Sequence, residues 1–236
     1  MSFKINNGFR SQAVKAVVFD LDGTLIDSTI DFAEMNRAAV RALIDNGLPR
    51  DALDTKCNVN DNINRAHAYF KEHGKIGWED AVERDLNRVS LEVEMVNVDR
   101  TKAIPGTLDL LKLLHKNEIR TAILTRGSRK YTLRALNASG LEGEFHTIVC
   151  RDDHPLTEAK PNPIALHRVF EQLSLTNEQC MFVGDHETDH LCAKGAGTPF
   201  AAVLTGFNGM DVWDRTRPDV VMDSIADLRG LLEVDR

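Results

Sequence analysis

The sequence has few cysteines and no long apolar segment among its 236 residues. The four cysteines stand singly, with no CxxC spacing, at Cys57, Cys150, Cys180 and Cys192. A disulfide framework or a zinc site favours paired spacings, so we expect reduced thiols and a cytoplasmic protein. No stretch approaches the roughly 18 apolar residues that span a bilayer, and positions 1–15 lack the apolar core of a signal peptide. We therefore expect no association with membranes.

An excess of basic residues is also absent. Lysine and arginine number 29 against 36 acidic residues, which gives a net charge of -7. Such a balance argues against general binding to nucleic acid or to anionic membranes. Hydrophobic residues make up 42% and charged residues 28%, an ordinary globular composition. At roughly 100–200 residues per domain, the length predicts one large domain or one domain with an insert.

Five short apolar segments alternate with helical patterns over most of the chain. They are residues 16–19, 121–124, 147–149, 180–183 and 201–204. Continuous apolar runs of this kind are typical of strands buried on both faces of a parallel sheet. Between them, Leu108, Leu111 and Leu114 form one helical stripe, and the apolar residues of 166–173 form another. The alternation predicts an α/β fold with a doubly wound parallel sheet.

The segment after the first strand interrupts this alternation and contains no convincing buried strand. Phe32, Met35, Ala39 and Leu43 follow a helical stripe, and residues 61–73 and 78–96 also have amphipathic helical patterns. We predict a helical domain over residues 28–103, inserted into an α/β core formed by residues 1–27 and 104–236.

Acidic residues follow the first predicted strand as Asp20-Leu21-Asp22-Gly23. Ligands of open α/β sheets bind at the carboxyl ends of the strands. A spacing of two places both side chains on one side of an extended backbone. Carboxylates held close together repel, so they bind a cation or adopt different pKa values. Taken alone, Asp-Gly after a strand is also an ordinary turn.

Other polar residues follow the later strands. Thr125 precedes Arg126-Gly127-Ser128, which is either a cradle of backbone N–H groups for phosphate or an ordinary helix N-cap. Lys160 lies before a helix and is either an anion ligand or a surface charge. Asp185 and Asp189 follow the fourth strand, and such carboxylates suit a hard cation.

Together these residues resemble the haloacid dehalogenase superfamily of aspartate-nucleophile phosphohydrolases over the whole chain. The run Asp20-Leu21-Asp22-Gly23-Thr24-Leu25 is similar to motif I, Thr125 to motif II and Lys160 to motif III. Residues 184–189 are similar to the GDxxxD form of motif IV. The helical insert resembles the cap of the phosphoglycolate-phosphatase-like subgroup.

The resemblance implies a Mg²⁺-dependent phosphatase acting on a small phosphorylated metabolite, as a monomer or homodimer. Asp20 is the implied nucleophile, Asp22 the general acid and base, and Thr125 and Lys160 the ligands of the phosphoryl group. Arg126 and Gly127 are further candidates for substrate binding, although Arg126 stands where the family often has asparagine. The implied metal ligands are Asp20, the backbone carbonyl of Asp22, Asp185 and Asp189.

Three alternatives remain open at this point. His186-Glu187-Thr188-Asp189-His190 matches the H-E-x-x-H zinc signature, although His186 follows a strand directly and is expected to cap a helix. A phosphomutase of the same superfamily would use the same residues while protecting the aspartyl-phosphate from water. A non-catalytic binding or regulatory protein could retain the fold alone. The identity of the phosphorylated metabolite is not predicted.

Overall fold

The computed structural model describes residues 3–5, 14–53, 59–74 and 78–232. Two compact units make up the chain, one of Met1–Ser28 with Asp99–Arg236 and one of Thr29–Val98. The assignment of a catalytic core and a cap to parts of the chain stays a prediction of the sequence. Among the described helices, none combines the length and apolar character needed to cross a membrane.

A seven-stranded sheet forms the centre of the first unit, in the order β1-β9-β8-β7-β2-β5-β6. Its strands are β1 (Phe3–Ile5), β2 (Ala16–Phe19), β5 (Arg120–Leu124), β6 (Thr147–Val149), β7 (Cys180–Gly184), β8 (Phe200–Val203) and β9 (Val220–Met222). Every pairing is parallel except that of β1 with β9. The predicted fold class is confirmed, with an antiparallel edge strand that the sequence did not indicate.

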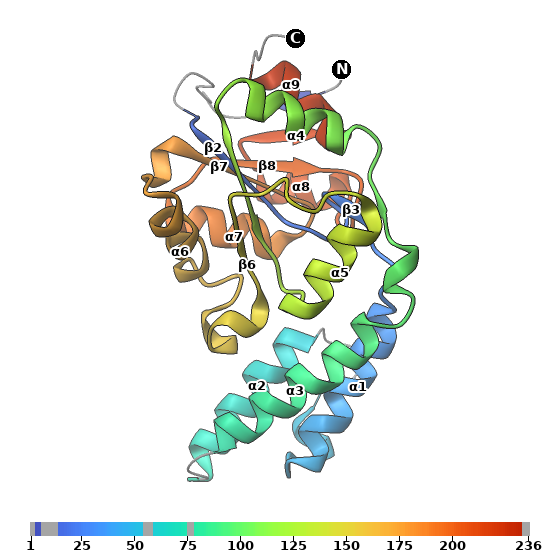
Figure 1. Cartoon of the computed structure of the whole chain (residues 1–236). Coiled ribbons are helices and arrows are strands. Elements are labelled where there is room, and N and C mark those ends of the chain that lie inside the picture. The colour runs from blue at the N-terminus through green and yellow to red at the C-terminus, as the bar shows by residue number, and fades with distance from the viewer. Residues whose placement is uncertain (1–2, 6–13, 54–58, 75–77, 233–236) are drawn as a thin grey trace. The chain divides into compact units, whose positions relative to one another are not determined.

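Helices cover both faces of this sheet (Figure 1). Helices α4 (Thr107–Lys116) and α9 (Leu228–Leu231) lie on one face, and α6 (Ile164–Leu173) and α7 (Glu187–Ala196) lie on the other. Alternate residues of each strand point to opposite faces. Ala16 and Val18 of β2 accordingly belong to the apolar cluster that includes α6 and α7.

The stripe predicted for α4 is partly wrong. Leu111 and Leu114 are buried as expected, but Leu108 is half-buried and Leu110 is buried instead. A spacing of three residues per step drifts around a helix of 3.6 residues per turn, so the buried face includes position 110.

The remaining elements of the first unit connect the strands and helices described above. They are β3 (Ile26–Asp27) and β4 (Lys102–Ala103), which pair with each other, α5 (Arg129–Ser139), α8 (Met210–Thr216), and the 3₁₀ turns Arg151–Asp153, Leu156–Glu158, Asn177–Gln179 and Ile225–Asp227. A further 3₁₀ turn, Val98–Arg100, spans the boundary between the two units. Helix α5 follows β5 directly, which places its N-terminus at the carboxyl edge of the sheet.

The second unit consists of α1 (Phe32–Asp45), the 3₁₀ turn Arg50–Ala52, α2 (Val59–Glu72) and α3 (Trp78–Glu94). Helix α1 packs against both α2 and α3. The predicted helices are present, but the stripe assigned to α1 is wrong at Phe32, which is 52% exposed. Its buried face is formed instead by Ala38, Ala39, Ala42 and Leu43. Small alanine side chains allow a helix to approach its neighbours closely, a feature that a search for large apolar residues does not detect.

Candidate active site

The carboxyl ends of three adjacent strands bring the predicted polar residues to one edge of the sheet. β2 lies between β7 and β5, and these strands lead into Asp20, Asp185 and Thr125. Ladder hydrogen bonds continue past the strand ends, because Asp20 N–H donates to the Val183 carbonyl at 2.9 Å. The parallel register therefore fixes the backbone from which these side chains project.

Three carboxylates, those of Asp20, Asp185 and Asp189, form a buried cluster at this edge. Each offers an oxygen that lies within 4.8 Å of the oxygens offered by the other two. The ammonium of Lys160 faces two of them, with its Nζ 2.6 Å from Asp20 Oδ1 and 2.7 Å from Asp189 Oδ1. Lys160 is 3% exposed, so its charge acts inside the protein rather than in solvent.

Hydrogen bonds and close packing hold the cluster in place. Thr24 Oγ1 donates to Asp185 Oδ1 at 3.0 Å, and Phe207 N–H donates to Asp185 Oδ2 at 2.7 Å. Asp189 Oδ2 accepts the N–H of His186 at 3.1 Å, which also caps α7. A β-carbon on Gly206 would overlap the Asp185 carboxylate, so this position requires glycine.

The carboxylates are short of positive charge. Burial, reinforced by Asp20 and Asp189, raises the pKa of Asp185 to about 8. Burial raises the pKa of Asp189 to about 6, although the neighbouring Lys160 ammonium opposes the shift. Burial disfavours the charge of Lys160, but Asp189 and Asp20 outweigh it and raise the pKa of that ammonium. A divalent cation would relieve this excess of negative charge, and carboxylate oxygens are the ligands that hard cations prefer. The donor set therefore fits such an ion.

Asp22 lies apart from this cluster. Its carboxylate is half-buried and accepts a hydrogen bond from the Tyr131 hydroxyl. The carboxylate is not one of the three that converge, so metal binding by the Asp22 side chain finds no support here. The role implied for its backbone carbonyl stays a prediction.

The segment after β5 differs from a simple phosphate cradle. Thr125 is buried, and its hydroxyl accepts the N–H of Gly127 at 2.9 Å, so this N–H points to Thr125. Ser128 caps α5 by accepting the N–H of Tyr131 at 3.4 Å. Substrate binding by Thr125 and Gly127 stays a prediction.

Arg126 folds back onto the segment that carries Lys160. Its guanidinium donates to the Lys160 carbonyl. Burial and the nearby Arg151 guanidinium lower the pKa of Arg126 to about 10, which leaves it charged at neutral pH. Arg151 is itself buried, and donates to the Arg126 carbonyl at 2.8 Å. Arg151 has no distinctive signal in the sequence, because it is a single charged residue just after a short strand.

The histidines of the H-E-x-x-H match do not form a zinc site. His186 is the extended N-cap residue of α7, as expected, and its Nδ1 accepts the Thr188 N–H at 3.1 Å. His190 stacks on Phe200, with ring centroids 5.2 Å apart. Within the part of the chain that the structure describes, the cluster suited to a metal contains aspartates and no histidine.

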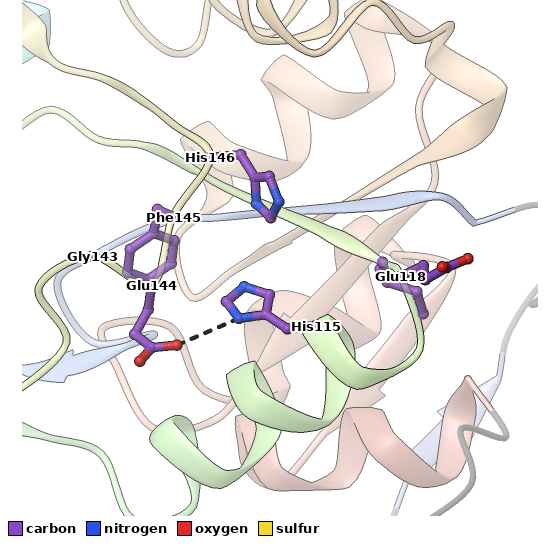
Figure 2. Close-up of a pocket in the computed structure, with 7 residues that line it drawn as sticks. His115, Glu118, Gly143, Glu144, Phe145 and His146 are labelled. Atoms are coloured by element: carbon purple, nitrogen blue, oxygen red, sulfur yellow. Dashed lines mark ion pairs between the residues drawn. The ribbon is translucent and has the colours of Figure 1, made fainter.

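A hollow of about 530 Å³ lies away from these residues, near the start of β5 and β6. Figure 2 shows His115 turned toward Glu144, with His115 Nδ1 3.5 Å from Glu144 Oε2. The hollow is lined by residues that precede these strands or end α4, whereas the carboxylate cluster lies beyond the opposite strand ends. It is therefore separate from the candidate active site.

Comparison with known proteins agrees with the fold. Residues 17–203 match the model of the haloacid dehalogenase-like hydrolase family. The chain is 31% identical to phosphoglycolate phosphatase 1 of Pseudomonas aeruginosa, over 93% of this chain and 80% of that protein. It is 30% identical to the phosphoglycolate phosphatase of Pseudomonas putida, over 92% of this chain and 78% of that protein.

Solved structures show the same fold. A hydrolase from Pseudomonas syringae superposes with a TM-score of 0.68 at 24% identity, covering 93% of this chain and 98% of that one. The parallel sheet with helices on both faces and a helical insert defines an α/β protein. The chain belongs to the haloacid dehalogenase-like hydrolase family. Within that family it is similar to phosphoglycolate phosphatases.

Proposed function

We propose that this enzyme is a Mg²⁺-dependent phosphomonoester hydrolase that acts on a small phosphorylated metabolite through an aspartyl-phosphate. Phosphoglycolate is the first substrate to test, because the relatives to which the chain is about 30% identical are named phosphoglycolate phosphatases. The observation that carries the proposal is the contact of Lys160 Nζ with both Asp20 and Asp189 inside a cluster of three carboxylates.

The cation-binding residues are Asp20, Asp185 and Asp189, with the backbone carbonyl of Asp22 as the further ligand that the family resemblance implies. When bound, Mg²⁺ supplies positive charge that offsets the repulsion between an anionic nucleophile and an anionic phosphate.

Asp20 supplies the nucleophile. Lys160 binds its Oδ1, which leaves Oδ2 as the oxygen to attack phosphorus. The new bond from Asp20 to phosphorus forms as the bond to the leaving alcohol breaks, and Asp22 donates the proton that this alcohol needs. In the second step Asp22 takes a proton from water, whose oxygen attacks phosphorus and releases phosphate and free Asp20.

Lys160 and Thr125 bind the phosphoryl oxygens. The Lys160 ammonium stays charged, because Asp189 and Asp20 raise its pKa. The Thr125 hydroxyl accepts the Gly127 N–H and keeps its own hydrogen to donate. Fixed donors directed at developing negative charge stabilise a transition state, because they need no reorganisation during the reaction.

Phosphate release from phosphoglycolate, sugar phosphates and nucleotides by the purified full chain with Mg²⁺ tests the proposal. We expect turnover that EDTA abolishes and that Asp20→Asn lowers at least about 1,000-fold, since no other group replaces the nucleophile. Asp27→Asn is the matched control, because Asp27 is an exposed aspartate of the same segment. Activity that survives Asp20→Asn, or inactivity on the whole panel, would overturn the proposal. Isomerisation of a sugar phosphate without net phosphate release would identify a phosphomutase instead.

A further inference from the structure

The hydroxyl of Tyr131 meets the carboxylate of Asp22, although 109 residues separate the two in sequence. Tyr131 lies in the first turn of α5 and is fully buried. Its hydroxyl donates to Asp22 Oδ1 at 2.5 Å. We propose that Tyr131 is a positioning residue that holds the Asp22 carboxylate in line for proton transfer to the leaving alcohol. The inference rests on the proposed function, in which Asp22 is the general acid and base.

The local sequence fixes where the phenol ring lies. Ser128 caps α5 and accepts the Tyr131 N–H, which sets the start of the helix. A β-carbon at Gly127 would lie 2.9 Å from Tyr131 Cδ1, so the absence of a side chain there gives the ring its space. The cap and the glycine together explain why the hydroxyl reaches Asp22 from a helix whose own sequence gives no catalytic signal.

A fixed partner matters at Asp22 because this side chain is half-buried and lies outside the carboxylate cluster. Lys160 contacts Asp20 and Asp189, whereas the Tyr131 hydroxyl contacts Asp22. The Tyr131 hydroxyl fixes Oδ1, and this contact orients the carboxyl group that exchanges a proton with the leaving group or with water. Proton transfer needs a heavy-atom distance of about 2.6–3.2 Å, and a displacement of about 1 Å can lower a rate about 100-fold.

Ser28 extends this arrangement. Its Oγ lies 3.5 Å from the Tyr131 hydroxyl, and it is the final residue of the first unit before the helical insert begins. Since the phenol hydrogen points to Asp22, Ser28 can serve as the donor to Tyr131.

Tyr131→Phe tests the proposal, because it removes the hydroxyl and keeps the ring. We compare kcat/KM on phosphoglycolate, whose alkoxide leaving group needs a proton, with kcat/KM on p-nitrophenyl phosphate, whose phenolate leaves without one. We expect a fall of about 10- to 100-fold on the alkyl ester and of less than about 3-fold on the aryl ester. Tyr69→Phe is the matched control, since Tyr69 lies in α2 and stacks on His73.

A double-mutant cycle separates positioning from general damage. Asp22→Asn should show the same selective loss, and adding Tyr131→Phe to it should cost nothing more, because the two residues act through one group. Equal losses on both esters, or a further loss in the double variant, would overturn the role of Tyr131. If Tyr131→Phe does not fold by circular dichroism, Tyr131→Leu provides the second variant, because it also removes the hydroxyl and keeps an apolar side chain at this buried position.

The two proposals fail in different ways. An inactive wild-type chain, or an Asp22→Asn variant with no selective loss on the alkyl ester, rejects the proposed function and the Tyr131 role with it. A wild-type enzyme and an Asp22→Asn variant that behave as expected, beside an unaffected Tyr131→Phe variant, reject the Tyr131 role alone.

Discussion

Single residues with no reactive group decide whether the carboxylates can converge. Gly206 leaves the space that the Asp185 carboxylate occupies, and the carboxylate accepts the N–H of the next residue, Phe207. Gly206→Ala should displace Asp185, lower phosphatase activity at least about 10-fold and raise the Mg²⁺ concentration needed for half-maximal rate. Phosphate release measured across a magnesium titration checks this expectation.

Gly140→Ala is the control for this substitution. Gly140 ends α5 with φ at 73°, and a β-carbon there would meet nothing within 4 Å. Alanine in a left-handed conformation costs about 1 kcal/mol, so the variant should melt earlier and keep its activity and magnesium dependence. Equal activity losses in the two variants would show that the effect of Gly206 is not specific to the site.

Buried thiols give a second prediction at this scale. Cys150, Cys180 and Cys192 are free and buried, while Cys57 lies outside the described residues. Burial raises the pKa of Cys150 and of Cys180 to about 11 and that of Cys192 to about 12. At pH 8 these thiols are protonated, and the thiolate is the reactive form. Iodoacetamide should therefore modify them at least about 10-fold more slowly in the native protein than in guanidinium chloride, as followed by peptide mass spectrometry.

The sequence predicted the cluster residues because each follows an apolar strand, and adjacent parallel strands bring such positions together. It could not predict Thr24, Tyr131 or Arg151. Their roles come from side-chain contacts across the fold, such as the bond between Thr24 and Asp185, which lie 161 residues apart. Nothing in the local pattern distinguishes these residues from ordinary polar positions.

At the scale of elements, continuous apolar runs predicted the central strands well because both faces of the sheet are covered. β6 spans Thr147–Val149 as predicted, whereas β8 begins one residue before the predicted segment, at Phe200. β9 was missed although Val220–Met222 is wholly buried, and β6, which is equally short, shows that length alone does not explain this. β1 was missed because an edge strand depends on a partner at the far end of the chain.

Helix α6 provides a test of how much its apolar face stabilises the fold. Leu166 is fully buried in the apolar cluster against the sheet, whereas Glu171 of the same helix is exposed. Leu166→Ala removes three carbon atoms and leaves a cavity, so the free energy of unfolding should fall by about 2–5 kcal/mol. Glu171→Ala should change it by less than about 0.5 kcal/mol. Urea denaturation of both variants measures the difference, and equal effects would contradict the assignment of the buried face.

For the whole molecule, the site concentrates charge that the fold alone does not neutralise. One buried ammonium contacts two of three clustered buried carboxylates, although a folding domain gains no stability from grouping like charges. The arrangement is understandable when the free energy of ligand binding is included, because a cation that binds only the folded state stabilises it. Stability, metal binding and catalysis are therefore linked through the same few side chains.

This linkage gives a prediction for the stability of the metal-free protein. The pKa of Asp185 is raised to about 8 and that of Asp189 to about 6, both above the ordinary value of 3.8 that they have when unfolded. Between the pKa values of the unfolded and the folded state, the folded state binds more protons than the unfolded state. The stability of the folded state therefore falls as pH rises from about 4 to about 8. The stability that proton binding by these two carboxylates gives the folded state is fully present below about pH 4 and is lost above about pH 8. At acid pH, other carboxylates of the chain govern how stability depends on pH.

Thermal melting in EDTA at pH 6.0, 7.0 and 8.5 measures this loss, and the same series with Mg²⁺ measures its recovery. We expect the melting temperature in EDTA to fall with rising pH, and the increase caused by Mg²⁺ to be largest at pH 8.5, where no proton competes for the carboxylates. Asp185→Asn removes the most strongly shifted group, so this variant should have a flatter pH dependence and a smaller response to Mg²⁺. If the wild-type protein gained stability from pH 6.0 to 8.5 in EDTA, the buried carboxylates would not be the groups that set its pH dependence, and the site would not be short of positive charge.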